Sequence, residues 1–223
     1  MLLLAADTSG KHGSMALARC DPYDTCDLIE AVSLAGGTFS AQLVPQIAGL
    51  LAKHGFNKQD IGAFAVTSGP GSFTGLRVGL AAIKALAEVL AKPIAAVSLL
   101  EAIAVSARLQ GKVIALLDAG RGEIYAGEYE VSGPLARVVS ERLLTLTDLL
   151  EAAAGSVVLS ADPGVADSVR NAGTEVMEIE LPGIKTIACL GWRKILAGET
   201  ISPEELDANY IRGSTQVFTK RSP

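Results

Sequence analysis

The sequence lacks the residues from which most metal and disulfide sites are built. Its 223 residues include two histidines and three cysteines, and no two cysteines have CxxC spacing. This odd, unpaired set argues against a disulfide framework or a thiolate zinc site and predicts reduced thiols in a cytoplasmic protein. His12 and His54 belong to no HExxH or His-x-x-x-His motif, so we expect no metal centre of that class. A hard-metal site made only of carboxylates stays open as an alternative, with Asp7 and Asp118 as candidate ligands.

Clusters of positive charge and long apolar runs are also missing. The formal net charge is −5, the isoelectric point is about 5.1, and no run of Lys or Arg forms a basic stripe. Unaided binding of a polyanion is therefore not expected, and any nucleic acid would be held through a partner. The apolar start, MLLLAAD, is too short for a signal peptide, and no apolar run reaches membrane-spanning length. The sequence thus predicts a soluble protein without a membrane segment.

What the sequence does contain is an apolar pattern typical of a folded α/β chain. Hydrophobic residues make up 49% and charged residues 19%, although aromatic residues are only 4%. A strand ending at Asp7 and its hairpin partner open the chain, and Ser40 would cap the first helix. A second helix is expected at about residues 73–90. Ser98 and Glu101 have capping-box spacing and predict a third helix directly after them.

The same order of elements restarts in the second half. A strand ending at Asp118 is followed by a glycine turn and a returning strand, then by helices near residues 146–154 and 184–197. This repetition indicates a duplicated α/β unit, although the halves share pattern and not residue identity. The predicted lobes are residues 1–99 together with a C-terminal helix at about 184–199, and residues 100–183, followed by a tail at 200–223.

The second helix begins in a glycine-rich loop that admits two interpretations. Glycines before a helix N-terminus leave backbone N–H groups free to face a phosphate, which favours nucleotide binding. However, GPGSFTGLR lacks the GK[ST] ending of a P-loop, and a tight strand-to-helix turn explains the glycines equally well. Ser72 has no histidine placed as its base, so we predict no catalytic residue. The candidate, vestigial nucleotide-binding residues are Asp7, Thr8, Ser9, Gly69, Gly71 and Asp118.

Small residues on the second helix suggest a docking role. Gly75 and Gly79 are four apart and continue through Ala82, whereas Leu76 and Leu80 mark a separate apolar stripe. Small residues let two helix backbones approach closely, so the first stripe predicts a partner helix. The alternative is that both stripes are buried within one domain. The predicted partner interface comprises Leu43, Ile47, Leu50, Gly75, Gly79, Ala82 and Leu86.

The sequence resembles the TsaB (YeaZ) family of tRNA threonylcarbamoyladenosine biosynthesis subunits over nearly its whole length. The stretches that carry the resemblance are LLLAADTSGKHGSMAL, LVPQIAGLL, SGPGSFTGLRVGLAAIKALA, LLDAGRGEIYAGEY and the terminal YIRG. The resemblance implies a two-lobed actin-like fold (the ASKHA, ribonuclease H-like superfamily) with mixed sheets flanked by helices. It also implies a non-catalytic paralogue of the catalytic subunit TsaD.

The resemblance further implies a place in a complex. The chain would pair with TsaD, be joined by the ATPase TsaE, and contact tRNA only through the complex, and it would form a homodimer when alone. The product would be N6-threonylcarbamoyladenosine at position 37 of tRNAs that read codons beginning with A. No cofactor is expected to bind tightly to the isolated chain, whereas ATP or ADP and a metal can sit at the interface with TsaD.

Two departures from the family pattern concern the first helix. The catalytic relatives carry a metal-binding His-x-x-x-His there, and neither histidine is present in this sequence. TsaB members often have a histidine shortly before the LLP-like element, where this sequence has Phe39. These differences argue against chemistry at that position and leave pairing intact. An ATP-dependent phosphotransferase of the actin-like superfamily stays the alternative function, and a metallopeptidase or glycoprotease is disfavoured.

Overall fold

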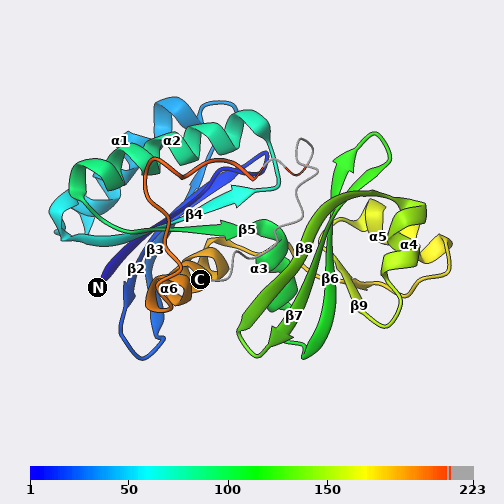
Figure 1. Ribbon diagram of the computed structural model, residues 1–223. Helices are drawn as coiled ribbons and strands as arrows, with labels where there is room; N and C mark the ends of the chain where they lie inside the picture. The colour runs from blue at the N-terminus through cyan, green and yellow to red at the C-terminus, as the bar shows by residue number, and fades with distance from the viewer. Residues whose placement is uncertain (210, 212–223) are drawn as a thin grey trace. The chain divides into compact units, whose positions relative to one another are not determined.

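The computed structural model describes residues 1–209 and Ile211, which form two compact units (Figure 1). Each unit is described by itself below. Unit 1 comprises Met1–Leu99 and Pro182–Asn209, and unit 2 comprises Leu100–Leu181 together with Ile211.

The structure describes only part of the predicted tail at residues 200–223. Residues 200–209 belong to unit 1, where Ile201 forms a single antiparallel bridge with Ile94. Tyr210 and residues 212–223 lie outside the described residues, and so does most of the terminal YIRG motif.

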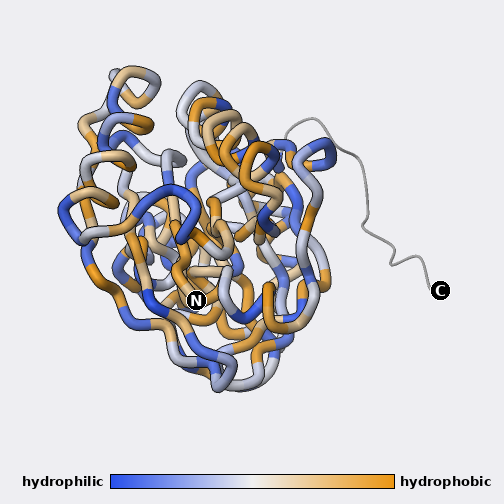
Figure 2. The backbone as a smooth tube through the Cα atoms, turned by 90° about the vertical axis from the view of Figure 1, so that its left-hand side faces the viewer, coloured by the Kyte–Doolittle hydropathy of each residue, from blue (hydrophilic) through white to orange (hydrophobic). Residues whose placement is uncertain are grey.

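Unit 1 is built on a mixed five-stranded sheet in the order β3-β2-β1-β4-β5. β1 pairs antiparallel with β2 and parallel with β4, and β5 is parallel to β4. The apolar residues of β1 are all buried, as expected of a central strand covered on both faces. Figure 2 shows hydrophobic stretches in the interior and hydrophilic residues at outer turns. The strands are β1 Leu2–Asp7, β2 Gly13–Cys20, β3 Cys26–Leu34, β4 Ile61–Gly69 and β5 Ile94–Ser98.

Three helices cover the two faces of this sheet. α1 and α2 pack side by side on one face, and α6 covers the other (Figure 1). α6 lies very close to β4, because a Cβ added to Gly191 would be 2.3 Å from the Cβ of Ala65. Glycine is therefore required at this contact. The helices are α1 Phe39–Lys53, α2 Phe73–Leu90 and α6 Ile184–Leu196, and a short 3-10 helix spans Lys58–Asp60.

Unit 2 repeats the topology of unit 1. Its sheet has the order β8-β7-β6-β9-β10, so a hairpin-forming strand again lies at the centre with a parallel neighbour on its other side. The predicted duplicated α/β fold with mixed sheets flanked by helices is therefore confirmed. The elements are α3 Leu99–Ser106, β6 Gly111–Gly120, β7 Glu123–Ser132, β8 Leu135–Thr145, α4 Leu146–Ala152, β9 Val157–Ser160, α5 Pro163–Asn171 and β10 Met177–Glu178.

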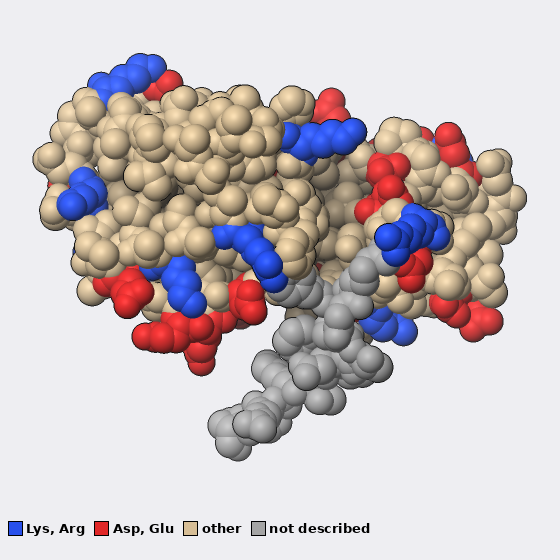
Figure 3. Space-filling view, turned by 90° about the horizontal axis from the view of Figure 1, so that it is seen from above, with Lys and Arg blue, Asp and Glu red and all other residues tan. Residues whose placement is uncertain are grey.

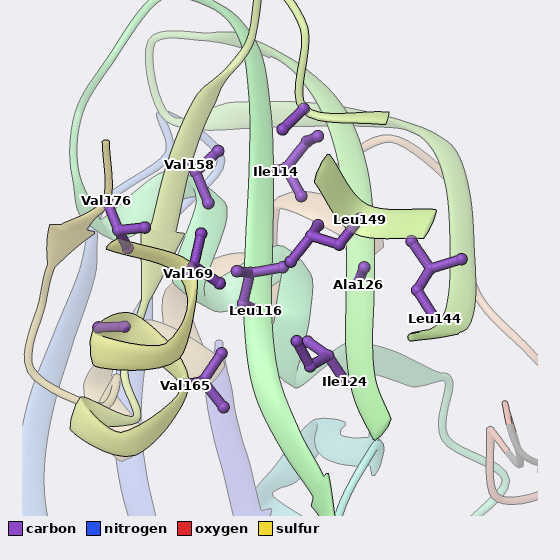
Figure 4. Close-up of a cluster of buried hydrophobic side chains, with 12 residues drawn as sticks. Ile114, Leu116, Ile124, Ala126, Leu144, Leu149, Val158, Val165, Val169 and Val176 are labelled. Atoms are coloured by element: carbon purple, nitrogen blue, oxygen red, sulfur yellow. The ribbon is translucent and has the colours of Figure 1, made fainter. Parts of the chain in front are cut away.

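The strand alternation of β6 builds a separate apolar cluster on each face of this sheet. Ile114 and Leu116 join the cluster that α4 and α5 cover (Figure 4). Val113 and Ala115 face the opposite side, where they pack with Ile103 of α3 and its neighbours. A strand that is buried on both faces has a continuous run of apolar residues, which explains the sequence VIALL within β6.

Local expectations were corrected at two elements. α1 begins at Phe39 with Thr38 as its N-cap, and within the described residues neither Thr38 nor Ser40 provides a side-chain cap hydrogen bond. The strand predicted across TEVMEIE reduces to Met177–Glu178. α3 begins directly after Ser98, and the capping box stays a prediction. Among the described helices, none is long and apolar enough to cross a bilayer.

Candidate functional site: the glycine turn and the outer face of α1 and α2

The glycine loop packs directly on the turn that follows β1. The backbone N–H of Ser72 donates to the carbonyl oxygen of Ser9 at 2.7 Å. The hydroxyl of Thr8 donates to the carbonyl oxygen of Gly75 at 2.7 Å. Ser72 also caps α2, because its Oγ accepts the N–H of Gly75 at 3.3 Å. The β1–β2 turn and the first turn of α2 are thus held together by reciprocal hydrogen bonds.

This contact leaves no room for side chains on the glycines. A Cβ on Gly71 would be 2.5 Å from the carbonyl oxygen of Ser9. A Cβ on Gly75 would be 2.1 Å from the carbonyl oxygen of Thr8, and one on Gly79 would be 2.2 Å from the Thr8 Oγ1. Gly75 and Gly79 therefore face their own unit. This corrects the docking role inferred for them, and the alternative in which the stripe is buried within one domain accounts for both.

The aliphatic residues assigned to the partner interface are also turned inward. Leu43, Ile47 and Leu50 are buried residues of α1. Ala82 and Leu86 are partly buried on α2. The predicted interface residues thus lie mainly on the inner side of the two helices. Strong hydrophobic periodicity marks the helix face that packs on the sheet, not the face that is open to a partner.

The outer side of the two helices is nevertheless apolar. Val44 is 53% exposed, Phe73 54% and Val89 76%, and several alanines of the two helices are exposed as well. Figure 3 looks onto this side and shows few charged side chains over the helices. The guanidinium of Arg77 lies 3.7 Å from the centre of the Phe73 ring. We define the α1–α2 face as the exposed residues Ala41, Val44, Ala48, Phe73, Ala81, Ala85 and Val89.

A pocket of about 330 Å³ lies where the helices begin. Its lining includes Lys11 and the hydroxyl-bearing residues Ser40, Ser72 and Thr74. Among the described residues, its lining has neither a carboxylate nor a histidine. Such a pocket suits a polar or anionic group but supplies no general base and no carboxylate for a metal.

The aspartates of the predicted nucleotide site are engaged in turns. Asp7 Oδ1 accepts the backbone N–H of Ser9 at 2.9 Å and its hydroxyl at 2.7 Å. Asp118 occupies the equivalent position in unit 2, where its Oδ1 accepts the N–H of Gly120 at 2.8 Å. The structure therefore brings Asp7, Thr8, Ser9 and Gly71 into one contact. Gly69 lies instead beside Leu76 and Asn209, and Asp118 belongs to the other unit.

Comparison with known proteins identifies the family. Residues 33–198 match the family described as TsaD, tRNA N6-adenosine threonylcarbamoyltransferase. The chain belongs to this family. It is 36% identical to the tRNA threonylcarbamoyladenosine biosynthesis protein TsaB of Bacillus subtilis over 68% of the chain and 65% of the relative. It is 33% identical to TsaB of Escherichia coli over 58% of the chain and 55% of the relative. The matches thus span less than two thirds of the length of these relatives.

A solved structure of a family member extends the match to the fold. YeaZ from Pseudomonas aeruginosa superimposes with a TM-score of 0.75 at 25% identity, covering 94% of this chain and 99% of that one. The resemblance to TsaB and YeaZ that the motifs indicated is therefore confirmed, and so is the two-lobed α/β architecture. The sequence analysis did not single out the α1–α2 face, because alanines and valines at outward helical positions give only a weak signal.

Proposed function

We propose that this chain is a non-catalytic partner subunit of the complex that makes N6-threonylcarbamoyladenosine at position 37 of tRNAs reading codons that begin with A. The observation that carries the proposal is the exposed apolar α1–α2 face on a chain whose relatives are named as biosynthesis proteins of this modification. Exposed contiguous apolar surface is typical of a protein-binding site.

The side chains described around α1 and the glycine turn support the non-catalytic assignment. α1 carries no histidine along Phe39–Lys53, and Phe39 is buried. Asp7 is held by Ser9, and the adjacent pocket offers hydroxyls and one lysine. An ATP-dependent phosphotransferase would need a carboxylate near the phosphates as base or metal ligand. The features around the glycine turn therefore favour a structural role over phosphoryl transfer.

The partners follow from this role. The catalytic subunit TsaD would dock on the α1–α2 face, and the same face would form a homodimer when the chain is alone. The ATPase TsaE would join the pair, and tRNA would be contacted only through the complex, because the chain is acidic overall. Such a subunit would work in the cytoplasm. ATP or ADP and a metal would bind, if at all, at the interface with TsaD and not tightly to the isolated chain.

A matched pair of surface variants tests the docking face. Val44→Asp places a carboxylate on the α1–α2 face, where Val44 is 53% exposed, and Val138→Asp places one on β8, where Val138 is 50% exposed. A carboxylate without a partner in an interface is costly, so Val44→Asp should weaken pairing with the catalytic subunit at least about tenfold, or about 1.4 kcal/mol. Val138→Asp should pair like the wild type.

Sedimentation velocity with the purified catalytic subunit measures both variants, and circular dichroism confirms that each is folded. The homodimer of the isolated chain should weaken in parallel, because one face serves both contacts. A folded Val44→Asp variant that pairs with wild-type affinity would place the docking face elsewhere.

A further inference from the structure

The three cysteines of the sequence come together in unit 1 and have no part in the proposed function. Cys20 ends β2 and Cys26 begins β3, and their sulfurs are 3.2 Å apart. Cys189 lies on α6, where its thiol donates to the carbonyl oxygen of Cys26 at 3.6 Å. Cys26 is therefore the middle member of a row of three sulfurs contributed by three elements.

The backbone already has the geometry of a disulfide at the first pair. Cys20 and Cys26 are direct partners in the antiparallel register of β2 and β3. Such partners have Cα atoms about 4.5–5.5 Å apart, which lies inside the disulfide range of about 4.4–6.8 Å. The connecting loop is fixed by Asp21, whose Oδ1 accepts the N–H groups of Tyr23 at 2.8 Å and Thr25 at 3.1 Å. Joining the two sulfurs requires no change in strand pairing.

Burial and protonation give the three thiols different roles. Cys20 and Cys26 are buried, whereas Cys189 is partly exposed, and its bond with Cys26 together with burial raises the pKa of its thiol. The hydrogen bond from Cys26 lowers the pKa of Cys20, helped by the N-terminal ammonium, which donates to the Cys20 carbonyl oxygen at 2.6 Å. For Cys26, the bond with Cys189 lowers the pKa, but the bond with Cys20 and burial outweigh it and raise the pKa to about 12. Cys20 is thus the better thiolate of the buried pair.

We propose that these cysteines are a thiol-oxidation site in which Cys189 passes oxidation from a small disulfide to the buried pair Cys20–Cys26. Cys189 loses its proton to water as its sulfur attacks the small disulfide, which forms a mixed disulfide on Cys189 and releases one small thiol. Cys26 then attacks the Cys189 sulfur and releases the second small thiol, and Cys20 finally attacks the Cys26 sulfur and releases Cys189. Two protein thiols are oxidised and lose their protons, and one disulfide is reduced to two thiols.

The inference is independent of the docking proposal. The cluster lies against α6, on the sheet face opposite α1 and α2 in the same unit (Figure 1). It also goes beyond the reduced thiols expected from the sequence, because residues far apart along the chain supply adjacent sulfurs. A reversible disulfide of this kind is what thiol sites in reducing compartments use for sensing.

The experiment uses oxidised glutathione as the probe on the purified full chain. Free thiols are alkylated at intervals and counted by mass spectrometry, and unreduced peptides are mapped. The wild type should lose two of its three thiols, with Cys20 linked to Cys26, and dithiothreitol should restore all three. Cys20→Ser should stop one step earlier, with Cys26 linked to Cys189. Cys189→Ser should lose its two thiols at least about tenfold more slowly, because the buried pair then lacks its exposed entry point.

Two controls keep the test decisive. The chain unfolded in urea must react, which shows that the oxidant is active, and circular dichroism must show that each variant is folded. Three free thiols in the folded wild type, a product that stops as glutathione on Cys189, or a link between chains would overturn the proposal. An unchanged rate in Cys189→Ser would overturn the transfer through Cys189. The single tryptophan, Trp192, donates to the carbonyl oxygen of Asp21 at 2.8 Å and gives a fluorescence signal for the same reaction.

Discussion

At the scale of single residues, Thr8 explains the small-residue stripe of α2. Its hydroxyl donates to the Gly75 carbonyl oxygen and occupies the space where a side chain on Gly79 would lie. The turn after β1 and the helix after β4 therefore fit together only because both positions are glycine. Substitution of Gly79 should therefore change the stability of the fold, whereas substitution in an exposed docking stripe would change partner binding.

Gly79→Ala should destabilise the fold. A glycine within a helix usually gains about 0.5–1 kcal/mol on change to alanine, but here the new Cβ would displace Thr8 and break its hydrogen bond, so we expect a net loss of about 1–3 kcal/mol. Gly49→Ala is the matched control, because no described atom outside its own helix lies within 4 Å of a Cβ there, and it should stabilise. Urea denaturation of both variants measures the difference. Equal changes in the free energy of unfolding for the two substitutions would contradict this account. The larger side chain of Gly79→Leu should prevent folding.

Glu30 provides a pH-dependent contribution at the same scale. Hydrogen bonds from Lys53 and His54 hold the pKa of Glu30 below its usual value. Because the pKa is lower in the folded chain, the contribution is present above the unfolded pKa of about 4.3 and is lost as the pH falls through the folded value.

Glu30→Gln should therefore lower the melting temperature slightly at pH 7, and its difference from the wild type should shrink below about pH 4. Glu151→Gln, the same substitution at an exposed glutamate on α4, serves as the control and should leave the melting temperature at pH 7 unchanged. Thermal denaturation followed by circular dichroism across this range provides the measurement. A difference that persists unchanged at low pH would mean that the carboxylate is not its source.

At the scale of elements, the side chains next to a helix terminus determine whether its free backbone N–H groups are capped. α4 has a capping box in which Thr145 Oγ1 accepts the Asp148 N–H at 3.2 Å and Asp148 Oδ2 accepts the Thr145 N–H at 3.3 Å. α1 begins at Phe39 with no side-chain cap hydrogen bond in the described structure. Short helices depend more on such caps because they have few internal hydrogen bonds.

Thr145→Ala should cost about 1 kcal/mol of stability, because the Asp148 N–H loses its acceptor and Asp148 Oδ2 loses the hydrogen bond from the Thr145 hydroxyl. Thr147→Ala, the same substitution at an exposed position within α4, should be neutral or slightly stabilising. Chemical denaturation compares the two variants directly. If both variants have the wild-type midpoint, the cap makes no contribution to stability.

At the scale of the whole molecule, two units with one topology carry no complete catalytic centre among the described residues. The first-strand aspartate of each unit accepts a backbone N–H two residues later. Each of these turns is therefore closed by its own hydrogen bond. This closure of both turns is consistent with the proposed non-catalytic role.

The isolated chain should accordingly show neither threonylcarbamoyl transfer to tRNA nor peptide hydrolysis, with or without added metal. Titration calorimetry with ATP and magnesium should detect no binding in the micromolar range. Robust turnover by the purified chain, or micromolar affinity for magnesium–ATP, would favour the phosphotransferase alternative instead.

The sequence by itself determined the alternating elements, the duplicated fold and the family, because binary patterning and local motifs such as GPGSFTGLR act over short distances. α2 begins and ends where the pattern predicted, and α6 ends within one residue of the prediction. The direction in which a small-residue stripe faces is not local. Gly79 meets Thr8, and Cys189 meets Cys26, only after the sheet and its helices have packed. The tertiary structure alone therefore decided that Gly75 and Gly79 are buried, that the alanines of the α1–α2 face are exposed, and that three isolated cysteines form one cluster.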